Sequence, residues 1–307
     1  MDEKTSCLAF SLFDGIGPKT FLKLLKHFGG AKKAYENLDT KNIKQVGIID
    51  NLFLKFDEFK KTFNLEQYLD KLKKTKVKVI GYTNLEYPEL LKKLKNPPIV
   101  LFCKGNLELL SSRRTLGVVG ARKITSYGRE VTEKLVSDLT NYSFTIVSGL
   151  AMGVDAQAHT AALKNQGSTI AVLGCGVDCC TPAENQDLYE KILDSGGLII
   201  SEYPLGAPPS KGSFPMRNRI IAGLSLGVLI TEAAEDSGSL ITAEESVKLE
   251  RPVFAVPGKV TSQMSRGAIK LLKQGGILVQ SAKDVLDKLE IKTPHFAHAS
   301  LGKQNLK

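Results

Sequence analysis

The sequence has 307 residues, of which 42% are hydrophobic and 24% are charged, and this composition suits a globular protein with one large α/β unit and a smaller one. No apolar stretch approaches the roughly 20 residues that span a bilayer, and acidic residues near the start exclude a secretory signal, so we expect a cytoplasmic protein with no membrane partner. The net charge of +10 favours polyanionic partners, although a lysine-rich solvated surface would explain it equally well.

Cysteine and histidine usage argues against a disulfide framework and against a metal cage. The five cysteines are an odd number in a chain that is not small. The cluster of Cys175, Cys179 and Cys180 has no second ligand pair of matching spacing, so we interpret these residues as small apolar side chains near a strand end. We therefore expect no bound metal and no cofactor.

Residues 1–70 are predicted to form helices, because apolar residues recur there at helical spacing and glycine pairs separate the runs. The stretch Leu12 to Lys19 is typical of a helix–hairpin–helix turn, which can offer backbone N–H groups to a phosphate. A tight turn between two packed helices explains its glycines as well. Both interpretations stay open at this point.

Residues 71–111 form a bridging segment, with strands expected at 77–80 and 99–102 and prolines between them. From residue 112 onward, short apolar runs alternate with amphipathic stretches of helical length, which predicts a doubly wound, mostly parallel sheet covered on both faces. The expected strands are 116–119, 145–147, 169–173, 198–200, 227–230, 253–256 and 277–279. This α/β domain is expected to span 112–290, and 291–307 to form a flexible tail.

Small, cationic and polar residues follow the predicted strands, at the edge where ligands of open parallel sheets bind. The candidate residues for binding nucleic acid, in chain order, are Gly120, Arg122, Ser148, Gly149, Lys211, Phe214, Arg217, Asn218, Arg219, Ser237 and Gly238. Their loops are expected to converge into an anion site larger than one phosphate. Phe214 would either stack on a base or anchor its loop in the core.

The sequence lacks the motifs of several enzyme classes. The first loop departs from the dinucleotide fingerprint, and the sequence has no P-loop and no serine nucleophile elbow. Acids at the strand ends could meet for glycosidic chemistry, or could serve as helix N-terminal acids; they are Asp155, Glu202, Glu232, Glu244 and Glu245. We expect a binding protein without catalytic residues.

Taken together, the segments GVVGAR, SGLAMGVDAQAH, TIAVLGCGVD, ISEYPLG, FPMRNRIIAG, TEAAEDSGSLITA and VFAVPG occur in an order that resembles the DprA/Smf family (DNA processing protein A). The resemblance implies an extended Rossmann-like fold, a small N-terminal SAM-like helical domain and a homodimer. It also implies binding of single-stranded DNA, protection of incoming strands and loading of RecA during natural transformation. We do not expect the C-terminal winged-helix domain of many members, since the sequence ends soon after Leu289.

Motif by motif, the resemblance assigns DNA contacts to residues of this sequence. The arginine of the first loop falls on Arg122, and the basic and aromatic pair falls on Lys211 and Phe214. The family's RNR motif and its second loop fall on Arg217, Asn218, Arg219, Ser148 and Gly149. The fold is also similar to that of cytokinin-activating phosphoribohydrolases, whose signature is echoed without its full glycine set at 237–245, and this enzyme class is the alternative.

Overall fold

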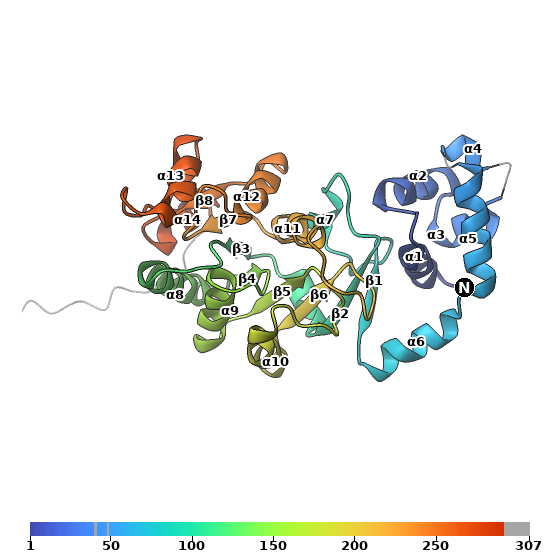
Figure 1. Cartoon of the computed structure of the whole chain (residues 1–307), viewed down its shortest axis with the longest axis horizontal. Helices are drawn as coiled ribbons and strands as arrows, with labels where there is room; N and C mark the ends of the chain where they lie inside the picture. The colour runs from blue at the N-terminus through green and yellow to red at the C-terminus, as the bar shows by residue number, and fades with distance from the viewer. Residues whose placement is uncertain (40–41, 48, 292–307) are drawn as a thin grey trace, which may run out of the picture.

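Nine strands form a single sheet in the order β1-β2-β6-β5-β4-β3-β7-β8-β9 in the computed structural model, which describes residues 1–39, 42–47 and 49–291. Figure 1 shows this sheet running through the larger part of the molecule, with the N-terminal helices at one end. Within the described residues, none of the helices is long and apolar enough to cross a membrane.

Seven strands, β3 to β9, pair in parallel and confirm the predicted doubly wound sheet. Their bounds are Thr115–Val119, Thr145–Ser148, Thr169–Leu173, Leu198–Ser201, Val228–Ile230, Val253–Ala255 and Ile277–Leu278. The chain winds outward from β3 to β6 and then returns to β7 on the other side of β3. This reversal creates a switch point between β3 and β7, where the carboxyl ends of two strands part and leave room for a ligand.

Helices cover both faces of the parallel strands, which explains why nearly all residues of these strands are buried. The helices that follow the strands are α8 (Ser126–Asn141), α9 (Val154–Lys164), α10 (Gln186–Asp194), α11 (Ser213–Leu224), α12 (Ser239–Lys248), α13 (Arg266–Lys273) and α14 (Ala282–Lys288). Apolar residues of α8, α9 and α14 form one core layer, and those of α11 and α12 form the opposite layer. Short 3-10 helices at Leu107–Ser111, Ala183–Asn185 and Gln263–Ser265 complete the connections.

The bridging segment belongs to the same sheet but pairs differently. Strand β1 (Lys78–Gly81) pairs antiparallel with β2 (Val100–Gly105), and β2 pairs antiparallel with β6. The short helix α7 (Glu89–Lys92) lies between them and packs against α11. Both strands were predicted from the sequence, whereas their antiparallel direction was not.

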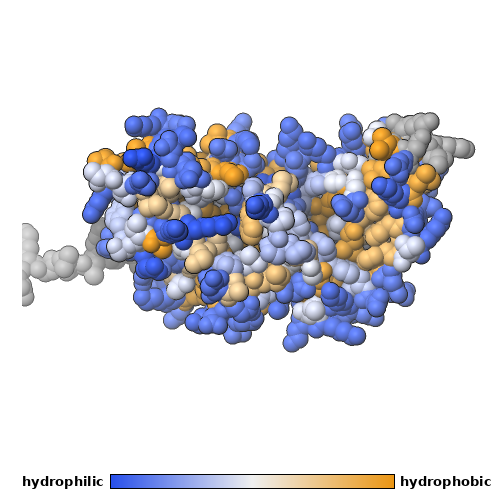
Figure 2. Space-filling view, in the orientation of Figure 1, coloured by the Kyte–Doolittle hydropathy of each residue, from blue (hydrophilic) through white to orange (hydrophobic). Residues whose placement is uncertain are grey.

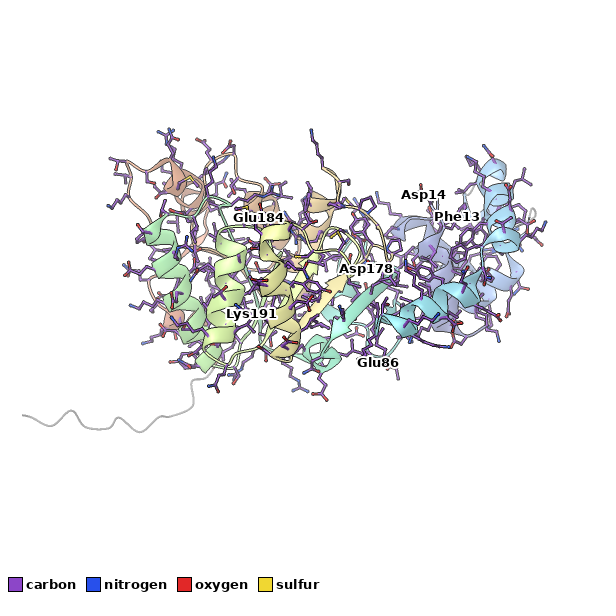
Figure 3. All side chains as sticks on the ribbon, turned by 60° about the horizontal axis from the view of Figure 1, so that its bottom comes forward. Phe13, Asp14, Glu86, Asp178, Glu184 and Lys191 are labelled. Carbon is purple, nitrogen blue, oxygen red and sulfur yellow. The ribbon has the colours of Figure 1, made fainter. Side chains whose placement is uncertain are left out.

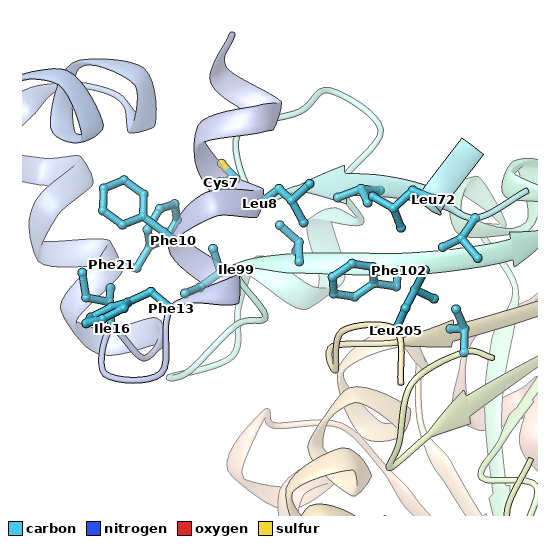
Figure 4. Close-up of a cluster of buried hydrophobic side chains, with 14 of the residues drawn as sticks. Cys7, Leu8, Phe10, Phe13, Ile16, Phe21, Leu72, Ile99, Phe102 and Leu205 are labelled. Carbon is cyan, nitrogen blue, oxygen red and sulfur yellow. The ribbon is translucent and has the colours of Figure 1, made fainter. Parts of the chain in front are cut away.

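The predicted N-terminal helical region is present as α1 (Glu3–Leu12), α2 (Pro18–Phe28), α3 (Ala31–Asn37), α4 (Ile43–Val46), α5 (Asp50–Thr62) and α6 (Leu65–Lys74). Aromatic rings fill its centre, where Phe10 lies 5.2 Å from Phe56 and 5.6 Å from Phe21 between centroids. This cluster continues through Leu8 of α1 to Phe102 of β2, as Figure 4 shows. The helices are therefore joined to the sheet edge by one apolar core, while a division at residue 70 stays a prediction.

The surface is mostly hydrophilic on the face drawn in Figure 2, with hydrophobic residues showing between the polar ones. Many lysines of the described residues are exposed, consistent with a general attraction to polyanions. The predicted flexible tail, 291–307, lies outside the described residues except for Ile291.

Candidate nucleic-acid interface

A cavity of about 620 Å³ lies at the carboxyl end of β3, beside the switch point, and most of the predicted residues line it. The predicted residues in its wall are Gly120, Arg122, Lys211, Phe214, Arg217, Asn218, Ser237 and Gly238. They come from the loops after β3 and β7, from the connection between β6 and α11, and from the start of α11. The loop after β4 also reaches this wall through Ala151, so the loops that follow β3, β4, β6 and β7 all contribute to one cavity.

The loop after β3 is held rigidly, so that the side chain of Arg122 projects from a fixed backbone. The N–H of Ala121 donates to the carbonyl oxygen of Glu232 at 2.7 Å, and the N–H of Val154 donates to the carbonyl oxygen of Ala121 at 3.0 Å. A Cβ on Gly120 would lie 2.5 Å from the carbonyl oxygen of Glu232, so only glycine fits this close approach. Arg122 itself is exposed at the rim of the cavity.

Arg122 and Phe214 form a cation–aromatic pair at the rim. The guanidinium carbon of Arg122 lies 5.5 Å from the centroid of the Phe214 ring, within the range of a cation–π contact. Phe214 is half-buried and lines the cavity, so one part of its ring is accessible from the cavity. Lys211 is exposed three residues earlier and adds a second cation.

The basic stretch 211–219, expected as a loop, is mostly helix, because α11 begins at Ser213. Pro215 does not prevent this, since the first turn of a helix does not need its N–H groups for intrahelical bonds. Because this part of the stretch is helical, Arg217 and Arg219 lie on different sides of α11. Arg217 lines the cavity described above, and Arg219 lines a different cavity.

Arg217 is a buried cation that ties two strand ends together. Its Nη1 atom donates to the carbonyl oxygen of Gly149, at 2.5 Å, and to that of Val172. These two residues lie at the carboxyl ends of β4 and β5. Asp155 lies beside it and accepts the N–H of Gly149 at 3.1 Å. Burial lowers the pKa of Arg217 and raises the pKa of Asp155, whereas the attraction between the two opposes both shifts.

Three predicted residues do not line this cavity. Ser148 is buried and donates its hydroxyl to the carbonyl oxygen of Val118 at 2.6 Å. A Cβ on Gly149 would overlap the guanidinium of Arg217, so this glycine makes room for the buried cation. Arg219 forms an ion pair with Glu202, at 2.5 Å, on the other side of α11.

Sequence reasoning missed some residues of the cavity wall. Lys123 is exposed beside Arg122 and lines the cavity, and its position next to a predicted arginine was an available signal. Thr242 of α12 and Met264 of the connection after β8 also line it. Met264 carried no signal, because neither its residue type nor its segment indicates a ligand site.

The acids at the strand ends have structural partners for the most part. Glu232 accepts the N–H of Thr125 at 2.8 Å and its hydroxyl at 2.6 Å, at the N-cap of α8. Glu245 pairs with Lys248 at 2.7 Å. In the part of the chain that the structure describes, Asp155 is the one acid of the five candidates that lines the cavity, and Arg217 is its neighbour.

The cysteine cluster follows β5 and belongs to the apolar core, with Cys175 buried and Cys179 and Cys180 packed against it. The Sγ atom of Cys175 lies 3.1 Å from the carbonyl oxygen of Cys179 and can donate to it. Burial raises the pKa of Cys175 to about 12 and that of Cys180 to about 11, so both thiols stay protonated at neutral pH. Among the described residues, no group of three or more acidic, histidine or cysteine side chains is placed to hold a metal ion.

Comparison with known proteins agrees with this architecture. The family model described as DNA recombination-mediator protein A matches residues 78–290. The protein Smf of Synechocystis sp. is 37% identical over 290 residues, which cover 94% of this chain and 73% of that protein. The X-ray structure of DNA processing protein A (DprA) from Streptococcus pneumoniae superposes with a TM-score of 0.82 at 35% identity, over 94% of this chain and 99% of that one.

A second solved structure describes a ligand for a similar protein. The structure of DNA processing protein A from Helicobacter pylori, whose description concerns its single-stranded DNA binding mode, gives a TM-score of 0.62 at 31% identity. The match covers 70% of this chain and 95% of that one. The similarity is thus spread over most of the Helicobacter pylori chain and is not confined to a single motif.

Proposed function

This chain belongs to the DNA recombination-mediator protein A family, and on that premise we propose that it binds single-stranded DNA in the cavity at the carboxyl end of β3. The observation that carries the proposal is the grouping of exposed Arg122, Lys123 and Lys211 with the ring of Phe214 around one cavity. The similar protein from Helicobacter pylori is described as binding single-stranded DNA.

The chemistry of the cavity suits a single strand. Cations at the rim neutralise phosphates, and an accessible aromatic ring accepts the face of any base, so a strand is held with little sequence preference. Gly238 leaves open space in the wall, since a Cβ there would meet nothing within 4 Å. Asn218 donates to the carbonyl oxygen of Gly238 at 3.3 Å and so connects α11 to this open segment. We assign Gly120, Ser148, Gly149 and Arg217 the role of shaping the cavity.

The family resemblance supports a proposal for the biological role. We propose that the protein protects incoming single strands and loads RecA on them during natural transformation, acting in the cytoplasm as a homodimer. These assignments are carried over from the DprA/Smf family. The cavity contributes the binding step on which each of them depends.

The protein is proposed to bind DNA without changing it. The partners of Glu232, Glu202 and Glu245 support this interpretation over glycosidic chemistry, because each carboxylate is engaged by a neighbouring residue. Incubation with nucleoside monophosphates tests the alternative. If the unsubstituted protein releases free base and the Glu244→Ala variant does not, the phosphoribohydrolase hypothesis is established and the non-enzyme proposal is rejected.

A gel shift with single-stranded and duplex oligonucleotides of equal length tests the binding proposal. We expect the single strand to be shifted at lower protein concentration than the duplex, and the Lys211→Ala variant to bind it less tightly. Lys134→Ala is the control, because Lys134 is an exposed lysine of α8 that does not line the cavity. Equal loss in both variants, or none in either, would reject the site.

A further inference from the structure

A second cavity, of about 570 Å³, lies between the N-terminal helices and the sheet. The turn between α1 and α2, residues 12–20, forms one wall. The opposite wall is formed by Asn96, Glu202, Tyr203, Met216 and Arg219. In Figure 3, Phe13 and Asp14 of this turn lie on the side of the N-terminal helices that borders the rest of the molecule. None of these residues lines the first cavity.

The polar groups of this cavity are incompletely paired. Nη2 of Arg219 donates to Oε2 of Glu202 at 2.5 Å, and the two side chains are only 7% and 15% exposed. Within the described residues, Nε and Nη1 of Arg219, Oε1 of Glu202 and Oδ1 of Asn96 have no hydrogen-bond partner. Buried polar groups are normally paired, because an unpaired one loses its hydration without compensation. Two donors and two acceptors at one place therefore indicate a ligand that carries both.

The walls narrow the class of ligand. Phe13, Ile16, Tyr203 and Met216 supply apolar and aromatic surface, and Met216 is 47% exposed. The Arg219–Glu202 pair has no net charge, and the carboxylate disfavours a phosphate next to it. A nucleobase fits both features, because it has flat faces for apolar contact and an edge with donors and acceptors for arginine and glutamate.

The two cavities share one helix. Phe214, Arg217 and Asn218 of α11 line the first cavity, while Met216 and Arg219 line the second. The first two turns of α11 thus separate the cavities, and a strand that leaves one can pass over the helix start to reach the other. At the far side, exposed Lys19 and the N-terminus of α2, where Gly17 makes no side-chain cap, offer contacts to the backbone of such a strand.

We propose that the second cavity takes an unpaired base of the strand that the first cavity holds, with Arg219, Glu202 and Asn96 contacting the edge of that base. This inference rests on the proposed function, since the first cavity delivers the strand. It gives the turn between α1 and α2 a role in closing a base pocket.

Two glycine substitutions can fill the cavities one at a time. Gly17 lines the second cavity and Gly238 the first, and a Cβ at either would meet nothing within 4 Å. Both have φ values that any residue adopts, −78° and −59°. Gly17→Leu and Gly238→Leu should therefore fold normally, which a thermal melt verifies. Gly17→Leu leaves the first cavity open and so serves as the control for Gly238→Leu.

The readout is photo-crosslinking of an oligonucleotide that carries 5-iodouracil, followed by mass spectrometry of the crosslinked peptides. In the unsubstituted protein we expect crosslinks at Phe214 and at Tyr203. Gly17→Leu should lower the Tyr203 crosslink by about fivefold or more while the Phe214 crosslink persists, since a stacked base contributes roughly that factor to affinity. Gly238→Leu should lower both, because the strand is no longer held in the first cavity.

The outcomes separate the two proposals. A Phe214 crosslink without any Tyr203 crosslink overturns the second site and leaves the proposed function in place. A Tyr203 crosslink that Gly17→Leu does not change also overturns the second site, because the base then lies elsewhere. Absence of both crosslinks, together with absence of oligonucleotide binding, overturns the proposed function itself and the inference that rests on it.

Discussion

Arginine has two separate uses around the first cavity. Arg122 is exposed at the rim, beside the ring of Phe214. Arg217 is 4% exposed and donates to carbonyl oxygens at the carboxyl ends of β4 and β5. A guanidinium can hold two strand ends at once because its donors are fixed in one plane. The two residues are therefore expected to respond differently to substitution, one in affinity and one in stability.

Replacement of Arg217 should destabilise the fold. Arg217→Met leaves two carbonyl oxygens and the carboxylate of Asp155 without their buried cation, and the loss of one partner of a buried pair typically costs about 3–5 kcal/mol. Urea denaturation should show the free energy of unfolding reduced by that amount. Arg113→Met, at an exposed position two residues before β3, is the control. A change below about 0.5 kcal/mol, the usual effect of a surface substitution, would contradict the structural role.

Phe214→Ala distinguishes base stacking from anchoring of the loop. If the ring stacks on a base, affinity for oligo-dT should fall roughly 5- to 150-fold, since stacking contributes about 1–3 kcal/mol per base. The dependence of affinity on salt should stay unchanged, because no charge is removed. Fluorescence anisotropy at several salt concentrations measures both quantities. Unchanged affinity with a reduced free energy of unfolding would show that the ring is an anchor.

At the scale of elements, the site depends on how closely the loop after β3 packs against the start of α9. Gly153, the N-cap of α9, has a φ of +80°, which L side chains rarely adopt. A Cβ there would also overlap the carbonyl oxygen of Ala121, which accepts the N–H of Val154. The position of Arg122 is thus set by a junction between two elements and not by its own loop alone.

Gly153→Ala should therefore reduce stability and DNA affinity together. Backbone strain and the clash each cost on the order of 1–3 kcal/mol, and the loop must move to relieve them. Gly212→Ala is a matched control, because its φ is −79° and a Cβ would meet nothing within 4 Å. That variant should stay within about 1 kcal/mol of the unsubstituted protein. Equal stability of the two variants in a thermal melt would contradict this account of the junction.

The positions of the parallel strands along the chain could be predicted from the sequence. Such strands are continuous apolar runs of strand length, because they are buried on both faces of the sheet. The convergence of Arg122, Lys211 and Phe214 followed from the rule that ligands bind at the carboxyl ends. The separation of Arg217 from Arg219 could not be predicted, because it depends on where α11 begins and hence on its rotational phase. Sequence spacing alone does not fix that phase when a basic stretch passes from loop to helix.

The antiparallel pairing of β1 and β2 at the sheet edge also could not be predicted from the sequence. Two short apolar runs predicted β1 and β2, but strand direction depends on which neighbour each strand meets. Here β2 pairs with β6, which lies far along the chain, and α1 packs on β1. The second cavity arises from this arrangement, because it places the turn between α1 and α2 opposite Glu202 and Arg219.

At the scale of the whole molecule, the net charge of +10 complicates any binding measurement. Exposed lysines all over the surface attract nucleic acid without a specific site, and such binding also weakens with salt. Salt dependence by itself therefore does not locate the strand. The difference in salt dependence between two variants of equal charge does, because both lose the same general attraction.

The most direct test compares two double variants by fluorescence anisotropy with labelled oligo-dT over a range of salt concentrations. Arg122→Ala/Lys211→Ala removes two cations from the cavity, and Arg113→Ala/Lys134→Ala removes two exposed cations that do not line it. Each phosphate contact contributes about 0.7 to the slope of log affinity against log salt for a single strand. We predict a slope shallower by about 1.4 for the cavity variant and little change for its control. Identical slopes and affinities for the two double variants would contradict the assignment of this cavity as the DNA site.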